Sequence, residues 1–213
     1  LGDNPLSSFI IKNFAPVDYP VGLHWHHFNQ PILTPIVPHE IDRNDKRIDN
    51  KILVYLPFEQ LNEVLALLEP FRHYEFFIYH RLSRAEDSGH IHLRPYSRSD
   101  FLNDLIECTG VISNAGFELA SEAMFLGKKI LVKPLAGQME QLSNALVIDS
   151  LELGMVMKRL NIAKVARFLA GPAGPPVKFP NVALMVADWI ESGQWEDMEG
   201  LAKKAWQQTA LPI

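Results

Sequence analysis

The sequence predicts an α/β protein in which helices cover both faces of a parallel sheet. From residue 51 onward, short apolar stretches alternate with longer stretches whose apolar residues recur at helical spacing. The short stretches, such as ILVYLP at 52–57, are apolar at nearly every position, which is typical of strands buried on both faces. Regular alternation of such strands with helices favours a parallel sheet over an antiparallel one.

The expected elements follow one another without a break in the pattern. Strands are expected at 51–57, 74–80, 89–96, 111–113, 128–134 and 154–160, and helices at 58–71, 97–110, 117–126, 137–148, 161–171, 181–191 and 195–208. The first of these helices has one apolar face and ends near Pro70, because proline cannot continue a helix. Ser97 or Ser99 is expected to cap the second helix, and Gly127 is expected to end the third.

Composition narrows the class of protein. The 213 residues are 47% hydrophobic and 21% charged, and the net charge is −5. These values are ordinary for a globular domain, and they give no general attraction to nucleic acid or to anionic membranes. The apolar runs are far shorter than the ~20 residues of a transmembrane helix. Cys108 is the single cysteine, which excludes an internal disulfide and fits a cytoplasmic location.

Three parts of the chain are expected. Residues 1–50 lack sustained periodicity, although PLSSFIIKNF near their start is typical of a helix. They are interpreted as the tail of a missing amino-terminal domain plus a linker. Residues 51–180 carry the alternating pattern, and residues 181–213 are expected to form carboxy-terminal helices.

Ligands of parallel sheets bind outside the carboxyl ends of the strands, and this rule points to the loops after Pro57, Ser113 and Pro134. In the second loop, Ser113–Gly116 leads straight into a helix. Such a turn presents unpaired N–H groups at the positive end of the helix dipole, where a diphosphate can approach closely. Glu122, farther along this helix, can accept hydrogen bonds from both hydroxyls of a ribose. The alternative is a plain tight turn followed by a solvated glutamate.

The third loop is rich in amides and carboxylates. PLAGQMEQLSNA at 134–145 places Gln138, Glu140, Gln141 and Asn144 just beyond a strand. Such side chains supply both donors and acceptors for sugar hydroxyls. Gln and Asn also occur commonly at helix starts, so a structural role remains an alternative.

The segment SNAGFELASEAMFLGKKILVKPLAGQMEQLSNA, residues 113–145, resembles the donor-binding segment of GT-B glycosyltransferases. The likeness is to UDP-glycosyltransferases and to the transferase that adds N-acetylglucosamine in peptidoglycan synthesis. The family pattern is small-x-Gly-Gly, Ser/Thr-x-x-Glu-Ala, Gly-x-Pro, an apolar strand ending in Pro, and Asp/Glu-Gln-x-x-Asn-Ala. Two positions depart from it, because Ala115 stands where glycine is usual and Lys129 replaces the proline. No glycine-rich loop follows the first strand either.

The resemblance implies one half of a GT-B fold, a Rossmann-like sheet at residues 51–180 that binds a nucleotide sugar. It implies that residues 1–50 end the missing acceptor half, and that the helices of 181–213 return to pack on that half. The chain alone is then inactive. By resemblance, the diphosphate contacts Ser113, Asn114, Ala115, Gly116 and Phe117; the ribose contacts Glu122; the donor sugar contacts Gln138, Glu140, Gln141 and Asn144; and the base contacts Pro95, Tyr96 and Ser97.

The function that follows is transfer of a hexose from a nucleoside diphosphate, UDP being favoured, to the hydroxyl of an unknown acceptor. The resemblance implies inversion at the anomeric carbon without a metal or a cofactor. HWHH at 24–27 lacks further ligand side chains nearby, so no metal site is predicted. Two alternatives remain: a sugar-nucleotide epimerase of the same fold, and a non-catalytic α/β binding domain.

Overall fold

The computed structural model describes residues 17–38, 40–41 and 47–211. The helix predicted within PLSSFIIKNF lies outside the described residues. The chain divides into two compact units, one formed by Leu1–Ile36 with Lys178–Ala210, and the other by Val37–Val177 with Leu211–Ile213. In the described parts of both units, no helix combines the length and the apolar character needed to cross a membrane.

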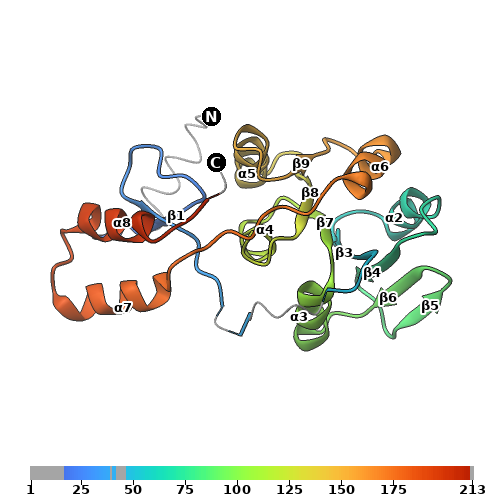
Figure 1. Ribbon diagram of the computed structural model, residues 1–213, viewed down its shortest axis with the longest axis horizontal. Coiled ribbons are helices and arrows are strands. Elements are labelled where there is room, and N and C mark those ends of the chain that lie inside the picture. The colour runs from blue at the N-terminus through green and yellow to red at the C-terminus, as the bar shows by residue number, and fades with distance from the viewer. Residues whose placement is uncertain (1–16, 39, 42–46, 212–213) are drawn as a thin grey trace. The chain divides into compact units, whose positions relative to one another are not determined.

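The larger unit, Val37–Val177, contains the predicted sheet (Figure 1). Its described residues form seven strands in the order β5-β6-β4-β3-β7-β8-β9. They are β3 (Lys51–Tyr55), β4 (Glu75–Tyr79), β5 (Glu86–Ser88), β6 (Ile91–Arg94), β7 (Gly110–Asn114), β8 (Lys129–Lys133) and β9 (Met155–Val156). All neighbouring pairs are parallel except β5 with β6. The Rossmann-like sheet expected from the sequence is therefore confirmed.

The strand order determines where a ligand can bind. Without β5, the order corresponds to 3-2-1-4-5-6 in chain sequence, which is the dinucleotide-binding order of doubly wound folds. β4 and β6 lie on one side of β3, whereas β7, β8 and β9 follow on its other side. The order in which strands are added therefore reverses between β3 and β7, which pair in parallel from Ile52↔Gly110 to Tyr55↔Ser113. At such a switch point the connections leave the sheet on opposite faces and open a crevice at the carboxyl ends of the strands.

Helices cover both faces of this sheet (Figure 1). They are α2 (Leu61–Leu68), α3 (Arg98–Glu107), α4 (Phe117–Phe125), α5 (Met139–Ser150) and α6 (Ile162–Ala170). α2 and α6 lie on one face, where Val64, Leu68 and Phe168 pack with Ile52 and Ile112 in one buried cluster. α3, α4 and α5 lie on the other face. The sheet core is thus apolar on both sides, as the continuous apolar strands predict.

Local signals account for several helix ends. The Ser97 side chain accepts a hydrogen bond from the Asp100 N–H and caps α3, as one of the two predicted candidates. Gly127 adopts a left-handed conformation with φ of +65° just after α4, which glycine tolerates at no steric cost. The hairpin strand β5 has no counterpart among the predicted elements. Its residues, Glu86–Ser88, are all exposed and polar, so they carry no apolar signal of a strand.

The smaller unit contains a parallel pair, β1 (Gly22–Leu23) with β2 (Ile32–Leu33), and two helices, α7 (Val182–Ser192) and α8 (Met198–Gln207). Leu33 packs in a buried cluster with Val182, Met185 and Leu201 from these helices. The Trp206 indole N–H donates to the Ile32 carbonyl at 2.7 Å. Residues from the start and the end of the chain therefore form one small core.

Candidate functional site

Two cavities lie in the larger unit, at the carboxyl ends of β3, β4, β6 and β7. The first has a volume of about 450 Å³, and its wall is largely aromatic and aliphatic. Phe101 meets Tyr55 and Tyr79 edge to face, with ring centroids 5.3 and 4.9 Å apart. The charged side chains among the described residues of this wall are Arg98, Glu118 and Glu122. An apolar cavity with a few polar groups on one side is typical of a small-molecule site.

The second cavity has a volume of about 550 Å³ and a different electrostatic character. Among the described residues that line it, His80 and Arg81 are basic and none is acidic. Tyr55, Tyr96 and Leu119 line both cavities. The two cavities are therefore contiguous and form one site with an acidic, aromatic part and a basic part.

The turn between β7 and α4 borders the basic part. Asn114 and Gly116 line the second cavity, and Gly116, the N-cap residue of α4, has no side chain with which to cap the helix. The Asn144 amide donates to the Ala115 carbonyl at 3.0 Å, and the Asn114 amide donates to the Lys133 carbonyl at 3.0 Å. These bonds hold the turn from α5 and from β8, so the N-terminal end of α4 faces the cavity in a fixed position.

Of the five residues predicted for the diphosphate, Asn114 and Gly116 line a cavity. Ser113 and Ala115 are buried behind them, and Phe117 begins the helix. The Asn114 Oδ1 and the Ser113 Oγ are buried without a hydrogen-bond partner among the described residues. Since buried polar atoms are normally hydrogen-bonded and these two atoms are enclosed, a bound water is their expected partner.

Glu122 lies on α4 and lines the aromatic cavity with Ser97 and Tyr96. Burial and, to a smaller extent, the negative charge of Glu118 raise the pKa of Glu122 to about 7, although the positive charge of Arg98 partly offsets them. Glu118 is exposed, whereas Glu122 is half-buried. A carboxyl group with a strongly perturbed pKa in a cavity is a frequent property of functional sites.

The residues predicted to contact the donor sugar occupy different positions on α5. Gln141 lines the basic cavity, and its Oε1 accepts a hydrogen bond from the Leu135 N–H at 3.1 Å. Gln138 and Glu140 are exposed and line neither cavity. Asn144 is buried and holds the Ala115 turn. A direct sugar contact by Gln138, Glu140 or Asn144 stays a prediction.

The loop after β6 was predicted to contact the base. Tyr96 is 53% exposed and lies between the two cavities, where its ring meets the Tyr55 ring edge to face. Ser97 lines the aromatic cavity, although its hydroxyl is engaged as the α3 cap. Pro95 lines neither cavity. The loop thus reaches the site mainly through Tyr96.

Several lining residues have no counterpart among the predicted site residues. They are Pro38 and Ile41; Tyr55, Pro57 and Phe58 at and after the end of β3; Tyr79, His80 and Arg81 at the end of β4; and Arg98, Phe101, Leu102, Glu118 and Leu119 on α3 and α4. The rule that ligands bind at carboxyl strand ends indicates the Pro57 loop from sequence. The α3 residues carry no comparable signal, since they look like one face of an ordinary amphipathic helix.

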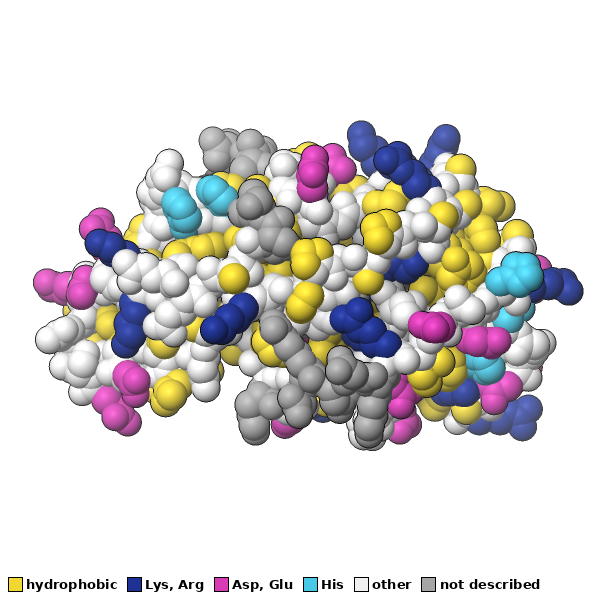
Figure 2. All heavy atoms as spheres, viewed as in Figure 1, with side chains coloured by type: hydrophobic (Ala, Val, Ile, Leu, Met, Phe, Trp, Pro, Cys, Tyr) yellow, Lys and Arg dark blue, Asp and Glu magenta, His cyan; other side chains and the backbone are white. Residues whose placement is uncertain are grey.

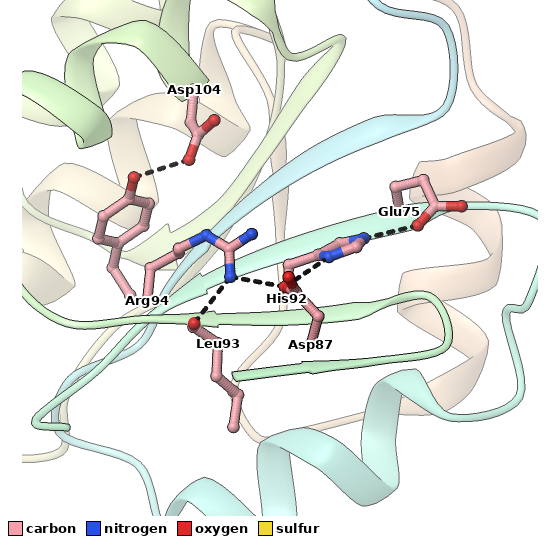
Figure 3. Close-up of polar contacts among 7 residues, drawn as sticks. Glu75, Asp87, His92, Leu93, Arg94 and Asp104 are labelled. Atoms are coloured by element: carbon pink, nitrogen blue, oxygen red, sulfur yellow. Dashed lines mark hydrogen bonds and ion pairs between the residues drawn. The ribbon is translucent and has the colours of Figure 1, made fainter. Parts of the chain in front are cut away.

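Arg94, which ends β6, is engaged elsewhere. Figure 3 shows its guanidinium pointing to the Asp87 carboxylate, at 2.6 Å, and to the Leu93 carbonyl. The same carboxylate contacts His92, whose other ring nitrogen lies 2.8 Å from Glu75. This network ties β5 to β6 and β4, and none of its members lines either cavity.

The histidines of HWHH have local partners. The Nδ1 atoms of His24, His26 and His27 accept hydrogen bonds from the backbone N–H groups of Trp25, Phe28 and Asn29. Among the described residues, no group of three or more potential ligands is arranged for a metal ion. Acidic and basic side chains both occur across the face shown in Figure 2, and neither sign forms an extended patch there.

Comparison with known families decides the assignment. The model of the family described as Glycosyl transferase family 1 matches residues 23–171. The chain belongs to glycosyl transferase family 1. The match spans β1 to the end of α6 and therefore includes both cavities. No curated protein matches the sequence of this family member.

Solved structures show the same fold. The glycotransferase of kitacinnamycin matches with a TM-score of 0.51 and 15% identity, covering 83% of this chain and 45% of that one. UGT89C1 of Arabidopsis thaliana, solved in complex with UDP-L-rhamnose, matches with a TM-score of 0.50 and 15% identity, covering 83% and 43%. This member of glycosyl transferase family 1 has the fold of one half of a GT-B enzyme and spans less than half the length of these two chains.

Proposed function

We propose that this chain binds the nucleoside diphosphate sugar donor of a hexosyltransferase. The observation that carries the proposal is the pair of contiguous cavities at the β3/β7 switch point, one largely aromatic and the other basic. A nucleotide sugar is complementary to this pair, since its uncharged nucleoside suits the aromatic cavity and its anionic diphosphate suits the basic cavity. UGT89C1, which shares the fold, was solved with UDP-L-rhamnose, and this supports UDP as the first nucleotide to test.

The nucleoside fits the aromatic cavity. Tyr55, Tyr96 and Phe101 offer ring surfaces to a base, and loss of one such base–aromatic contact costs ~1–3 kcal/mol in other proteins. Glu122 lies on the α4 side of this cavity and accepts hydrogen bonds from the two ribose hydroxyls. The carboxylate form is the better partner, because it accepts from both donors at once.

The diphosphate and the sugar fit the basic cavity. The N-terminus of α4, which begins after Gly116, carries the partial positive charge of the helix dipole. The side-chain amides of Gln141 and Asn114 line the same cavity. The orphan Asn114 Oδ1 is satisfied if a hydroxyl of the ligand or a bound water donates to it.

The reaction is a single displacement at the anomeric carbon. The acceptor oxygen forms a bond to the anomeric carbon while the bond between that carbon and the diphosphate oxygen breaks. The electron pair of the broken bond leaves with the nucleoside diphosphate. The proton of the acceptor hydroxyl passes to a base that the proposal leaves unassigned. The positive end of α4 stabilises the charge that develops on the leaving group, which is the role that a divalent cation has in many transferases.

The acceptor is proposed to bind to a second half of the enzyme. Because the chain spans less than half the length of the matched structures, a second α/β half is proposed to supply the acceptor site and the base. The chain alone then binds the donor without transferring its sugar.

Ligand-observed NMR with UDP, dTDP, GDP and their hexose conjugates tests the function. We expect saturation transfer to one nucleoside diphosphate and to its sugar conjugate, and competition between the two. Equal signals for all three bases would argue against a base-specific cavity. Silence across the whole panel would contradict the proposed function.

Donor affinity is expected to depend on pH through Glu122. With a pKa of about 7, the carboxylate fraction falls from roughly nine-tenths at pH 8 to one-tenth at pH 6, and the affinity falls by about tenfold if only this form binds. Calorimetric titration with UDP-glucose is the measurement, because its diphosphate has no ionisation in this range. In Glu122→Gln the dependence should vanish. A wild-type affinity that is constant from pH 6 to pH 8 would contradict the prediction.

A further inference from the structure

The basic cavity is lined by one arginine, Arg81, that has no ion-pair partner among the described residues. Arg81 directly follows β4 and lines this cavity with Asn114 and Gly116. Among the described residues it has no hydrogen bond or ion pair, and its side chain is exposed. An unpaired guanidinium that borders a cavity without acidic lining attracts an anion.

Other basic side chains near these strand ends are already engaged. Arg94 binds Asp87 (Figure 3), Arg98 lies 3.1 Å from Glu40, and Lys133 lies 2.6 Å from Glu59. Among the described residues, Arg81 is therefore the arginine that lines the second cavity, and it has no hydrogen bond or ion pair within the protein.

His80 holds the backbone of this position. Its N–H donates to the Arg94 carbonyl at 3.1 Å and extends the pairing of β4 with β6 by one residue. Its ring Nε2 lies 3.1 Å from the Glu59 carbonyl, which can only accept, so Nε2 carries the proton and donates. The backbone beside Arg81 is thus fixed by two contacts of His80, whereas the exposed Arg81 side chain lines the cavity without a hydrogen bond or ion pair among the described residues.

We infer that Arg81 binds the diphosphate of the donor across the cavity from the N-terminus of α4. This inference rests on the proposed function and adds to it. The sequence has no glycine-rich loop after β3, where YLPFEQ occupies positions 55–60. The chain therefore lacks backbone N–H groups from a glycine-rich loop on that side, and a side-chain cation from the end of β4 takes their place. A guanidinium suits this task, because its planar fork matches two phosphate oxygens.

Arg81 also acts in the transfer step. When the bond between the anomeric carbon and the diphosphate oxygen breaks, negative charge increases on the terminal phosphate. Arg81 and the α4 N-terminus then stabilise this charge from opposite sides of the cavity. The bond changes remain those of the displacement, with the acceptor proton passing to the base, and Arg81 neither gains nor loses a proton.

Calorimetry on the full chain compares wild type, Arg81→Gln and Arg81→Lys. UDP, dTDP and GDP are first titrated into wild type. The diphosphate that binds most tightly and its nucleoside are then titrated into each variant. Arg84 provides the matched control, since it is an exposed arginine of the same loop that lines neither cavity. We expect Arg81→Gln to weaken the diphosphate by roughly tenfold to a hundredfold, the usual effect of losing a hydrogen bond to a charged group.

Further readouts separate a ligand contact from a structural role. Arg81→Gln should leave nucleoside affinity unchanged and reduce the salt dependence of diphosphate affinity, while Arg81→Lys should recover part of the loss. Arg84→Gln should match wild type throughout. Equal diphosphate affinity in Arg81→Gln and wild type would overturn the inference and leave the proposed function standing. If the wild type binds none of the three diphosphates, the proposed function fails and the inference fails with it.

Discussion

Glu122→Ala is expected to weaken nucleoside diphosphate binding by at least about a hundredfold. The carboxylate is proposed to accept hydrogen bonds from both ribose hydroxyls, and each hydrogen bond to a charged group contributes ~1.5–3 kcal/mol. The half-buried position of Glu122 on α4 excludes much of the water that would replace these bonds. Alanine supplies no acceptor, so both bonds are lost together.

Paired ligands make this test specific for the ribose. Isothermal titration of UDP and 2′-deoxyUDP should show weaker binding of the deoxy compound to wild type, and no difference between the two in Glu122→Ala. Glu63→Ala is a suitable control, because Glu63 is an exposed glutamate on α2, on the opposite face of the sheet. A Glu122→Ala variant that still discriminates between the two ligands would place the ribose elsewhere.

Lys51→Met is expected to lower the free energy of unfolding of the larger unit by about 3 kcal/mol. The Lys51 ammonium is buried, 2.7 Å from Asp104 and 2.6 Å from Glu107, and it lies 4.3 Å from the centre of the Phe77 ring. Burial lowers the pKa of Lys51, but the hydrogen bonds to the two carboxylates outweigh this and the net shift is upward. Removal of one member of a buried ion pair leaves a charge without compensation, which costs ~3–5 kcal/mol, and we use the lower end because Glu107 is one-third exposed.

The remaining charge is mainly that of Asp104. Its Oδ2 accepts from the Tyr79 hydroxyl at 2.7 Å (Figure 3), and this single bond cannot replace an ammonium partner. The loss corresponds to a Tm lower by roughly 6–12 °C for a domain of this size. Urea unfolding of Lys51→Met measures the loss of stability, and Lys158→Met, at an exposed lysine, is the control. Asp104→Asn added to Lys51→Met should restore part of the stability, and equal stabilities of the two lysine variants would refute the role of the pair.

The sequence predicts most of the secondary structure because the signals are local. The interior strands β3 and β7 each contain a short apolar run, and helices follow with amphipathic spacing. The Ser97 cap and the Gly127 end depend on the chemistry of single residues. β5 is the exception, because an exposed edge strand of Glu, Asp and Ser is stabilised by pairing and not by burial.

Within the candidate site, the sequence locates the turn at Asn114–Gly116, Glu122 and Gln141, since parallel strands place their carboxyl ends on one edge. It does not locate Tyr55, Phe101 or Arg81, whose nearness depends on strand order. β3 pairs with β7 although β4, β5 and β6 intervene in the chain.

The sequence by itself therefore determines the α/β class, the presence and approximate positions of most elements, and the residue types available at each strand end. Only the tertiary structure decides that the β3, β4 and β7 ends meet around two contiguous cavities, and that their charges separate into an acidic and a basic part. Strand order results from long-range packing of many apolar side chains with similar local preferences, and no single residue encodes it.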